Sequence, residues 1–297
     1  MSDLPVPAAE APRGAGWLHR FVTRRAAAAV DLALLKLMMT DDRFPTAADL
    51  NQLRAEVADT LDDYRTRGFI HDPRSFHADP PPLPTLEVRR GRHPTVSYKV
   101  GSFASGYVPN AKPEYRDRWL SYEANRTART TMMRHEDPPG SPPRPWLVCL
   151  HGLGTGNAWM DLPAFRAEVL HKQLGINILM PVLPLHGARR APGMDRGAMV
   201  SFRMLDTLHG LAQAVWDTRR LIRWLRAHGA EKIGVFGLSL GAYTASLVSA
   251  FEDNELLLAG IPLAAIPELF NGHAPDDLAA DTGVELPGDD LEDIFRV

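Results

Sequence analysis

Short apolar runs in the second half of the chain alternate with segments of helical periodicity. The runs lie at residues 146–150, 176–183, 232–236 and 257–261. Nearly continuous apolar runs of this length are typical of strands that are buried on both faces of a parallel sheet. Residues 161–174 and 201–228 have helical patterns, and the longer one fits a crossover between parallel strands. The pattern predicts an α/β fold, a mostly parallel sheet with helices on both faces.

Helical patterns also precede this region. Residues 46–67 carry apolar side chains at helical spacing, and residues 17–40 form an amphipathic pattern that is rich in Arg in its first half. For residues 17–40 we favour packing on the core over contact with a membrane interface. The proline-rich segment 79–84 cannot continue a helix. We therefore expect an N-terminal helical arm and linker over residues 1–94, and an α/β core over residues 95–297.

The first strands of the sheet are expected just after the arm. Residues 96–100 and 119–134 alternate apolar or β-branched positions with polar ones, which is typical of half-exposed antiparallel strands. The basic cluster at residues 89–93 comes before them. We interpret it as a solvated turn, because no glycine loop there could cradle an anion.

The strongest chemical signal is the segment from Glu231 to Phe251. The apolar run ends at Gly237, Ser239 follows two residues later, and Gly241 opens a helical pattern of small residues. A serine at a sharp strand-to-helix turn needs small neighbours, because the strand and the helix pass close together. The N–H of Leu240 would open the helix, where unpaired donors favour a developing negative charge. The motif predicts a nucleophilic serine.

A second glycine-rich turn follows the run at 146–150, in the sequence PWLVCLHGLGTG from Pro145 to Gly156. With these two motifs, the chain resembles the α/β-hydrolase superfamily over about residues 97–263. The resemblance implies a serine hydrolase that acts on a carboxylic ester or thioester through Ser239. It also implies an oxyanion hole formed by the backbone N–H groups of Leu153 and Leu240.

The resemblance implies that an acid and a histidine follow the serine, in that order. His273 is the one histidine after Ser239, and Glu268 is the acid just past an apolar run. These are the candidate base and acid, although the family's histidine lies about two βα units further on. We therefore expect that the last two strands of the fold, with the usual acid and histidine, are absent from this chain. A sheet that ended near residue 261 would have an exposed edge, through which the chain would self-associate.

The segment PLHGARR, from Pro184 to Arg190, follows the run at 176–183, at the end where open α/β sheets place their ligands. The resemblance implies that His186 fixes a loop and takes no part in catalysis. Arg189 and Arg190 are candidates for binding an anionic group of a substrate. A solvated basic turn is the favoured alternative.

Composition and charge indicate which partners, compartment and cofactors to expect. A net charge of −3 and a pI near 6.4 give no reason to expect a nucleic-acid partner. The single cysteine, Cys149, lies in an apolar run and indicates a core residue in a reducing, cytoplasmic compartment. Neither a metal motif nor a dinucleotide-binding motif is found, so no cofactor is expected. Two alternatives to the hydrolase remain open: a hydrolase-fold protein that is truncated or impaired because its catalytic histidine is missing, and a non-catalytic binding module that uses the N-terminal helices.

Overall fold

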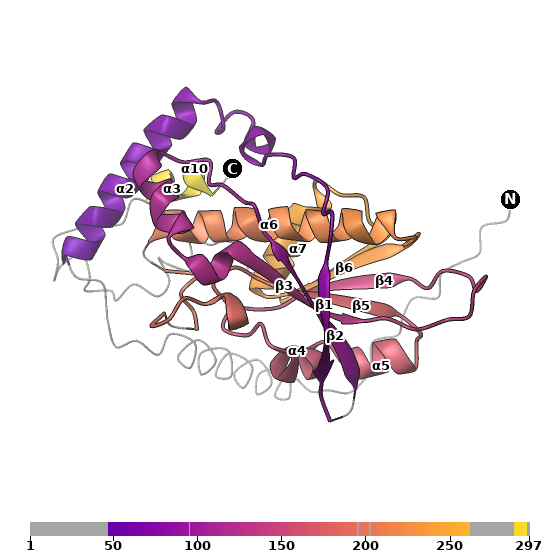
Figure 1. Cartoon of the computed structure of the whole chain (residues 1–297). Coiled ribbons are helices and arrows are strands. Elements are labelled where there is room, and N and C mark those ends of the chain that lie inside the picture. The colour runs from indigo at the N-terminus through magenta and orange to yellow at the C-terminus, as the bar shows by residue number, and fades with distance from the viewer. Residues whose placement is uncertain (1–46, 95, 195, 202, 262–287, 296–297) are drawn as a thin grey trace, which may run out of the picture. The chain divides into compact units, whose positions relative to one another are not determined.

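The computed structural model describes residues 47–94, 96–194, 196–201, 203–261 and 288–295. These residues belong to one compact unit, Asp42–Val297, which is built on a seven-stranded sheet of order β1-β2-β3-β5-β4-β6-β7 (Figure 1). The strands are β1 (Glu87–Arg92), β2 (Ser97–Ala104), β3 (Thr127–Met133), β4 (Trp146–Leu150), β5 (Asn177–Val182), β6 (Ile233–Leu238) and β7 (Leu256–Gly260).

The sheet has a parallel half and an antiparallel half. Strands β5, β4, β6 and β7 are parallel neighbours, and they are the four strands that the apolar runs predict. Strands β1, β2 and β3 pair antiparallel, and β3 joins them to β5. Because parallel strands end at the same edge of a sheet, the loops after β4, β5 and β6 lie close together.

Helices cover both faces of the sheet (Figure 1). The long helix α6 (Met204–Ala227) packs with α7 (Leu240–Ser249) and α2 (Ala47–Thr66) on one face, around the larger apolar core. The short helices α4 (Ala158–Ala164) and α5 (Ala167–Lys172) cover the opposite face. The predicted α/β fold with helices on both faces is confirmed.

Helix α2 is confirmed where its apolar spacing predicts it, and it contributes to the main core. Leu50, Leu53 and Tyr64 are each at most 2% exposed. Helix α10 (Gly288–Ile294) packs beside α2, with Ile294 buried and with an ion pair of 3.3 Å between Arg65 and Asp293. Residues 17–40, for which we predict an amphipathic helix, lie outside the described residues. None of the helices in the described ranges combines the length and the apolar content needed to cross a membrane.

The prediction of one strand over residues 119–134 is wrong in its first half. Helix α3 (Pro113–Leu120) and the 3₁₀ turn η2 (Glu123–Arg126) come first, and strand β3 starts at Thr127. Pro113 suits the start of a helix because it lacks only an N–H that would be unpaired there. The indole of Trp119 is 2% exposed and donates a hydrogen bond to Gln213 (2.9 Å). This contact with a residue 94 positions away in the sequence thus outweighs the local alternation of apolar and polar residues, which favours a strand.

The basic cluster at residues 89–93 is not a turn, because most of it belongs to edge strand β1. Its Arg side chains are exposed, as expected, but its backbone pairs with β2, with Arg90 opposite Lys99. The boundary that we place between residues 94 and 95 therefore falls between two paired strands. The helix predicted over residues 161–174 is also divided, because Arg166 has a left-handed backbone (φ 49°) between α4 and α5.

Candidate active site

Ser239 lies at the junction of β6 and α7, with a backbone that few side chains adopt. Its φ is 52° and its ψ is −116°. A non-glycine residue at positive φ costs on the order of 1–3 kcal/mol and persists only where its surroundings hold it. Two backbone hydrogen bonds do so: the Ser239 N–H donates to Gly260 O (2.9 Å), and Ser239 O accepts from the Ala242 N–H (2.9 Å). The side chain is half-buried at the carboxyl edge of the sheet.

Glycines on both sides of Ser239 allow the close approach that this turn requires. A Cβ atom on Gly237 would lie 2.1 Å from Gly241 O, and one on Gly241 would lie 1.9 Å from Leu150 O. Both contacts are with backbone atoms, which cannot move aside as a side-chain end can. The predicted physical role of these two glycines is therefore confirmed.

The loop after β4 lies next to Ser239. A Cβ atom on Gly152 would be 3.6 Å from Ser239 Cβ, which is ordinary van der Waals contact. His151 holds this loop: its Nε2 accepts a hydrogen bond from the Leu183 N–H (3.0 Å), and its Nδ1 lies 2.8 Å from Gly152 O. The neutral ring with its proton on Nδ1 satisfies both contacts. Burial lowers the pKa of His151 to about 4, so the ring stays neutral near pH 7.

His186 lies beside this ring. The two imidazole centroids are 5.0 Å apart, and His186 Nδ1 lies 2.8 Å from Pro184 O. Burial lowers the pKa of His186 to about 3, and His151 adds to the effect. Its buried Nε2 has no hydrogen-bond partner among the described residues. His186 directly precedes the 3₁₀ turn η3 (Gly187–Arg189) and is buried there as a neutral ring.

The far end of the loop is fixed by the first turn of α4. Asn157 caps the helix by accepting a hydrogen bond from the Met160 N–H (3.2 Å). The Gly156 N–H donates to Asp161 Oδ1 (3.3 Å). Burial raises the pKa of Asp161 to about 6, although the hydrogen bonds from Gly156, Thr155 and Asn157 act in the opposite direction. No motif in the sequence marks Asp161 as part of this site.

We expect Asp161→Asn to remove a pH dependence of stability. The carboxyl titrates near 6 in the folded protein and near 3.8 without its surroundings, so its contribution is present below pH 3.8 and is lost as the pH rises through 6. The variant keeps an oxygen acceptor for the Gly156 N–H. Its free energy of unfolding should rise relative to wild type by up to about 3 kcal/mol between pH 4 and pH 7. Urea denaturation at both pH values measures the change, and parallel curves would contradict it.

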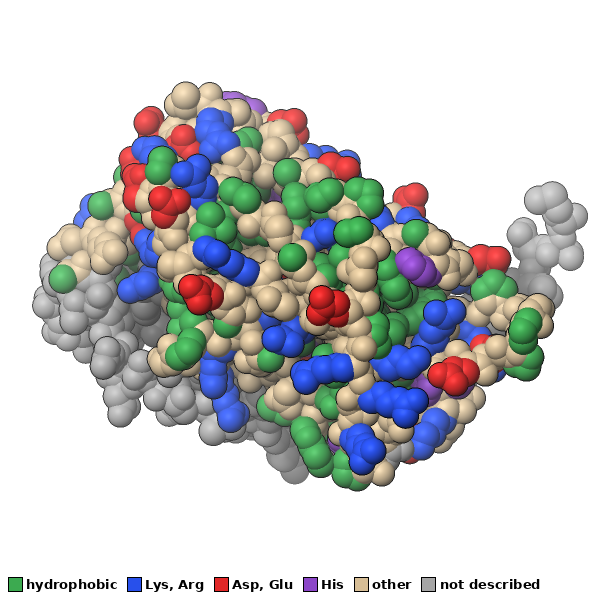
Figure 2. Space-filling model, viewed as in Figure 1, with side chains coloured by type: hydrophobic (Ala, Val, Ile, Leu, Met, Phe, Trp, Pro, Cys, Tyr) green, Lys and Arg blue, Asp and Glu red, His purple; other side chains and the backbone are tan. Residues whose placement is uncertain are grey.

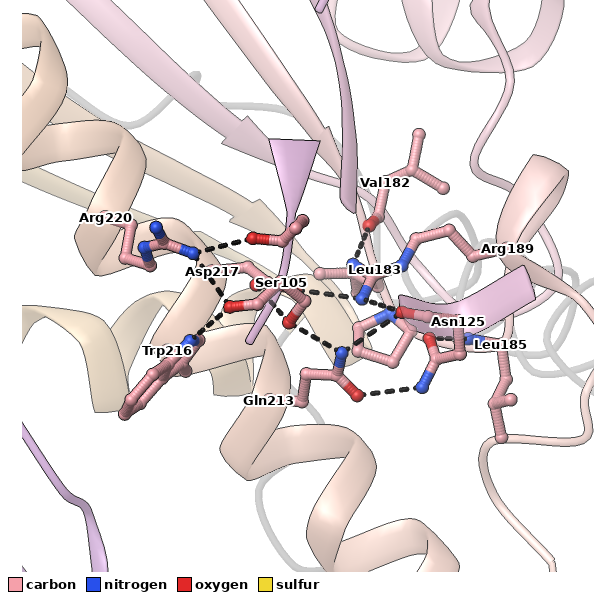
Figure 3. Close-up of polar contacts among 12 residues, drawn as sticks. Ser105, Asn125, Val182, Leu183, Leu185, Arg189, Gln213, Trp216, Asp217 and Arg220 are labelled. Carbon is pink, nitrogen blue, oxygen red and sulfur yellow. Dashed lines mark hydrogen bonds and ion pairs between the residues drawn. The ribbon is translucent and has the colours of Figure 1, made fainter. Parts of the chain in front are cut away.

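Arg189 neither binds from the surface nor belongs to a solvated turn, so both interpretations of this residue are wrong. Its side chain is 1% exposed and is paired with Asp217 on α6. Arg189 Nη2 donates to Asp217 Oδ2 (2.8 Å), and Nη1 donates to Val182 O (2.9 Å) (Figure 3). The second carboxylate oxygen accepts from Ser105 Oγ (2.7 Å). The neighbouring Arg190 is exposed.

The Arg189–Asp217 pair belongs to a larger buried network (Figure 3). Gln213 Nε2 donates to Ser105 Oγ (2.8 Å), and Gln213 Oε1 accepts from Asn125 Nδ2 (2.8 Å). Asn125 Oδ1 in turn accepts from the Leu185 N–H (3.3 Å). These bonds tie the loop after β5 to α6 and to the antiparallel strands. The network thereby supports the loop that carries His186.

A sequence signal for this network exists in α6. Five of its buried polar residues recur every three or four positions: Asp206, His209, Gln213, Asp217 and Arg220. This spacing places them on one face of the helix. A polar stripe along a helix that apolar residues otherwise bury indicates a buried polar network.

The remaining predicted site residues are distributed as follows. Leu240 is the first residue of α7 and is buried, and Leu153 is half-buried in the loop after β4. His273 and Glu268 lie outside the described residues. Within the described ranges, no His, Cys, Asp or Glu residues gather in a group of three or more that could hold a metal ion.

The family comparison agrees with this geometry. The family described as "Alpha/beta hydrolase domain containing 18" matches residues 119–267, about half of the chain, including both glycine motifs. The chain belongs to this family of the α/β-hydrolase superfamily. The resemblance that the two motifs predict is therefore confirmed.

Two curated relatives are uncharacterized proteins of Mycobacterium tuberculosis. The protein of strain CDC 1551 / Oshkosh is 44% identical over 225 residues, which are 75% of this chain and 53% of the relative. The protein of strain ATCC 25618 / H37Rv is 43% identical over 225 residues, which are again 75% of this chain and 53% of the relative. The chain thus spans about half the length of the curated relatives that it matches.

Solved structures with a similar fold include esterases. An acetyl xylan esterase from Paenibacillus sp. R4 is 13% identical, with 88% of this chain and 78% of that chain covered at a TM-score of 0.45. A cold-adapted esterase from an Arctic intertidal metagenomic library is 17% identical, with 57% and 61% covered at a TM-score of 0.38. At these levels the likeness concerns the fold and says nothing about a substrate.

Proposed function

We propose that the chain is a serine hydrolase that acts on a carboxylic ester or thioester through Ser239. The observation that carries the proposal is the backbone of Ser239, which has φ 52° at a strand–helix junction beside Gly152. Such strain clusters at functional sites, and here it lies in a member of the α/β-hydrolase superfamily.

The oxyanion hole of the proposal consists of the N–H groups of Leu153 and Leu240. Leu240 opens α7, where the first amides have no partner within the helix and the helix dipole favours negative charge. Among the hydrogen bonds between described residues, neither amide donates. The contact between Gly152 and Ser239 supports a position of the Leu153 loop close to the serine. Two such donors would stabilise the charge that develops on the substrate carbonyl oxygen.

The proposed reaction has two steps. Ser239 Oγ bonds to the carbonyl carbon while a base takes its proton, and the bond to the alcohol oxygen or thiol sulfur then breaks as that group leaves with the proton. Water next attacks the acyl carbon while the base takes one of its protons, the bond to Ser239 Oγ breaks, the base returns the proton to Oγ, and the carboxylic acid product leaves. His273 is the proposed base and Glu268 the proposed acid, on the grounds of their order in the sequence after Ser239.

One observation favours a second candidate, a hydrolase-fold protein with an impaired reaction. His273 comes about two βα units before the place where the family's histidine lies, and both nitrogens of His151, in the loop next to Ser239, are occupied. An inactive base would leave residual turnover from the oxyanion donors alone, so weak esterase activity would fit both candidates. The binding module that uses the N-terminal helices remains a third hypothesis.

The cytoplasmic location is also part of the proposal, supported by the one cysteine, whose buried thiol has a pKa well above its usual range.

Labelling with a fluorophosphonate probe tests the proposal. We expect the wild-type chain to be labelled and Ser239→Ala to remain unlabelled, because the probe reacts only with an activated serine hydroxyl. His273→Ala should slow labelling by at least about 100-fold if His273 is the base. Circular dichroism of each variant checks that it remains folded.

The controls separate the two candidates. Ser246→Ala removes another serine, an exposed one that donates to Ala242 O within α7, and it should leave labelling unchanged. Labelling that persists in Ser239→Ala would overturn the proposal. Wild-type protein that stays unlabelled at long times would leave the impaired hydrolase as the better description.

A further inference from the structure

The peptide unit between Gly152 and Leu153 carries an oxygen and an N–H that cannot turn independently. A peptide bond is planar and trans, so the carbonyl of Gly152 and the N–H of Leu153 point in opposite directions in one plane. Groups that hold Gly152 O therefore also set the direction of the Leu153 N–H, the proposed oxyanion donor. Two donors hold this oxygen: the protonated Nδ1 of His151 (2.8 Å) and Oγ1 of Thr155 (3.0 Å).

Thr155 has one hydroxyl proton and two acceptors for it. Besides donating to Gly152 O, its side chain hydrogen-bonds to the carboxyl of Asp161, which also accepts from the Gly156 N–H (3.3 Å). A neutral carboxyl has an O–H of its own to donate to Thr155 Oγ1, and the Thr155 proton then stays on Gly152 O. An ionised carboxylate only accepts, and its hydrogen bonds are about twice as strong as neutral ones. It therefore draws the Thr155 proton away from Gly152 O.

We propose that Thr155 is a positioning residue of the oxyanion hole and that the protonation state of Asp161 controls it. With Asp161 neutral, Gly152 O keeps both donors and the Leu153 N–H is held in one direction. With Asp161 ionised, His151 alone holds this oxygen and the Leu153 N–H is less fixed. The effect on catalysis rests on the proposed serine hydrolase, whereas the effect on the direction of this N–H does not.

Two titratable rings pack against the same loop. His151 and His186 both approach Gly156, because an atom of each would lie 3.0 Å from a Cβ atom placed there. Burial lowers the pKa of His151 to about 4 and that of His186 to about 3. Both rings are therefore neutral over the range in which Asp161 titrates, and they add no competing change of charge between pH 5 and pH 8.

Asp161 changes charge near pH 6. It is 5% exposed, and burial raises its pKa to about 6, with no charged side chain of the described ranges among the causes. Arg189, in the loop that adjoins Gly156, is paired with Asp217. The Lys and Arg side chains that Figure 2 shows over the region where Figure 1 places β1 and β2 lie at the surface, where salt screens them. The oxyanion hole should therefore be better ordered below pH 6 than above it.

The rate of fluorophosphonate labelling between pH 5 and pH 8 tests the effect on catalysis. Asp161→Asn mimics the neutral carboxyl, because its amide can accept from Gly156 and donate to Thr155. Relative to wild type it should label equally at pH 5 and about 3- to 10-fold faster at pH 8, the range expected for one hydrogen bond. Thr155→Val should label about 3- to 10-fold more slowly than wild type at pH 5, and within about 2-fold of it at pH 8.

A matched control separates this effect from the loss of a buried hydroxyl in general. Thr60 is buried in α2, and its hydroxyl also donates to a backbone oxygen, Glu56 O (2.7 Å). The labelling rate of Thr60→Val relative to wild type should not change with pH. Each ratio to wild type at one pH cancels the titration of the catalytic base, which the variants share.

An NMR titration tests the direction of the Leu153 N–H and needs no activity. Isotope labels on the glycine carbonyl carbon and the leucine nitrogen select Gly–Leu pairs, of which the sequence has three, at 152–153, 210–211 and 237–238. The Leu153 signal should shift with a midpoint near pH 6 in the wild type and stay constant in Asp161→Asn. In Thr155→Val it should shift by less than about half as much, because the link to Gly152 O is gone. Leu211, within α6, is the internal control.

The outcomes separate this proposal from the serine hydrolase. A Leu153 signal that does not titrate, or that titrates equally in Thr155→Val, would overturn it, and so would labelling ratios that are the same at pH 5 and pH 8. A chain that stays unlabelled at every pH would count against the hydrolase itself. The Leu153 signal would then still decide whether Thr155 and Asp161 set the direction of this amide.

Discussion

Asp217→Ala is expected to lower the free energy of unfolding by about 3–5 kcal/mol, because it leaves the buried positive charge of Arg189 without a counter-ion. Asp217 is 2% exposed, and its carboxylate accepts hydrogen bonds from Arg189 (2.8 Å) and Ser105 (2.7 Å). Without it, a guanidinium that is 1% exposed loses its counter-ion. Urea denaturation monitored by circular dichroism measures the loss.

Two controls decide whether the buried charge is the cause. Burial raises the pKa of Asp217 and lowers that of Arg189, so desolvation exceeds the mutual attraction of the pair. The double variant Asp217→Leu/Arg189→Met should therefore be more stable than Asp217→Ala, because both charges are gone. Asp137→Ala breaks an ion pair of the same kind with Arg144 at the surface and should change the unfolding midpoint little. A double variant as unstable as Asp217→Ala would contradict this explanation.

Gly241→Ala is expected to cost more than about 3 kcal/mol and to disturb the turn at Ser239. The added Cβ atom would lie 1.9 Å from Leu150 O and 2.6 Å from His151 O, so helix α7 would have to move away from β4. Overpacking against side chains typically costs about 1–3 kcal/mol, and backbone atoms relax less. Thermal unfolding and chemical denaturation of the variant measure the loss.

Gly152→Ala is the matched control for this prediction. It adds the same methyl group in the same site, but the nearest atoms would be Leu238 O at 3.5 Å and Ser239 Cβ at 3.6 Å. These are ordinary contacts, so the free energy of unfolding should change by less than about 1 kcal/mol. Equal stability of the two variants would show that the close approach at Gly241 is relieved elsewhere.

The parallel half of the fold and the serine turn could be predicted from the sequence because their signals are local. An apolar run over residues 146–150 becomes β4 without a change in its bounds, since a strand covered on both faces needs little beyond continuous apolar side chains. The spacing of Gly237, Ser239 and Gly241 predicts the strained turn, since only small residues fit between a strand and a helix that pass so closely.

The antiparallel half could not be predicted as well, because distant contacts decide it. Trp119 alternates with its neighbours as a strand residue would, yet it lies in α3, held by Gln213 on α6. The Arg residues of β1 are typical of a turn as much as of an edge strand, and only pairing with β2 distinguishes the two. Arg189 looks like a surface residue until Asp217 is placed beside it.

The sequence by itself thus determined the elements whose causes lie within a few residues: the apolar strands, the long helices and the backbone of the Ser239 turn. Only the tertiary structure decided which partners the buried polar side chains meet. The physical reason is that burial and ion pairing depend on partners brought together by the fold. Asp217 and Arg189 are 28 residues apart in the chain, and no local pattern records that they meet.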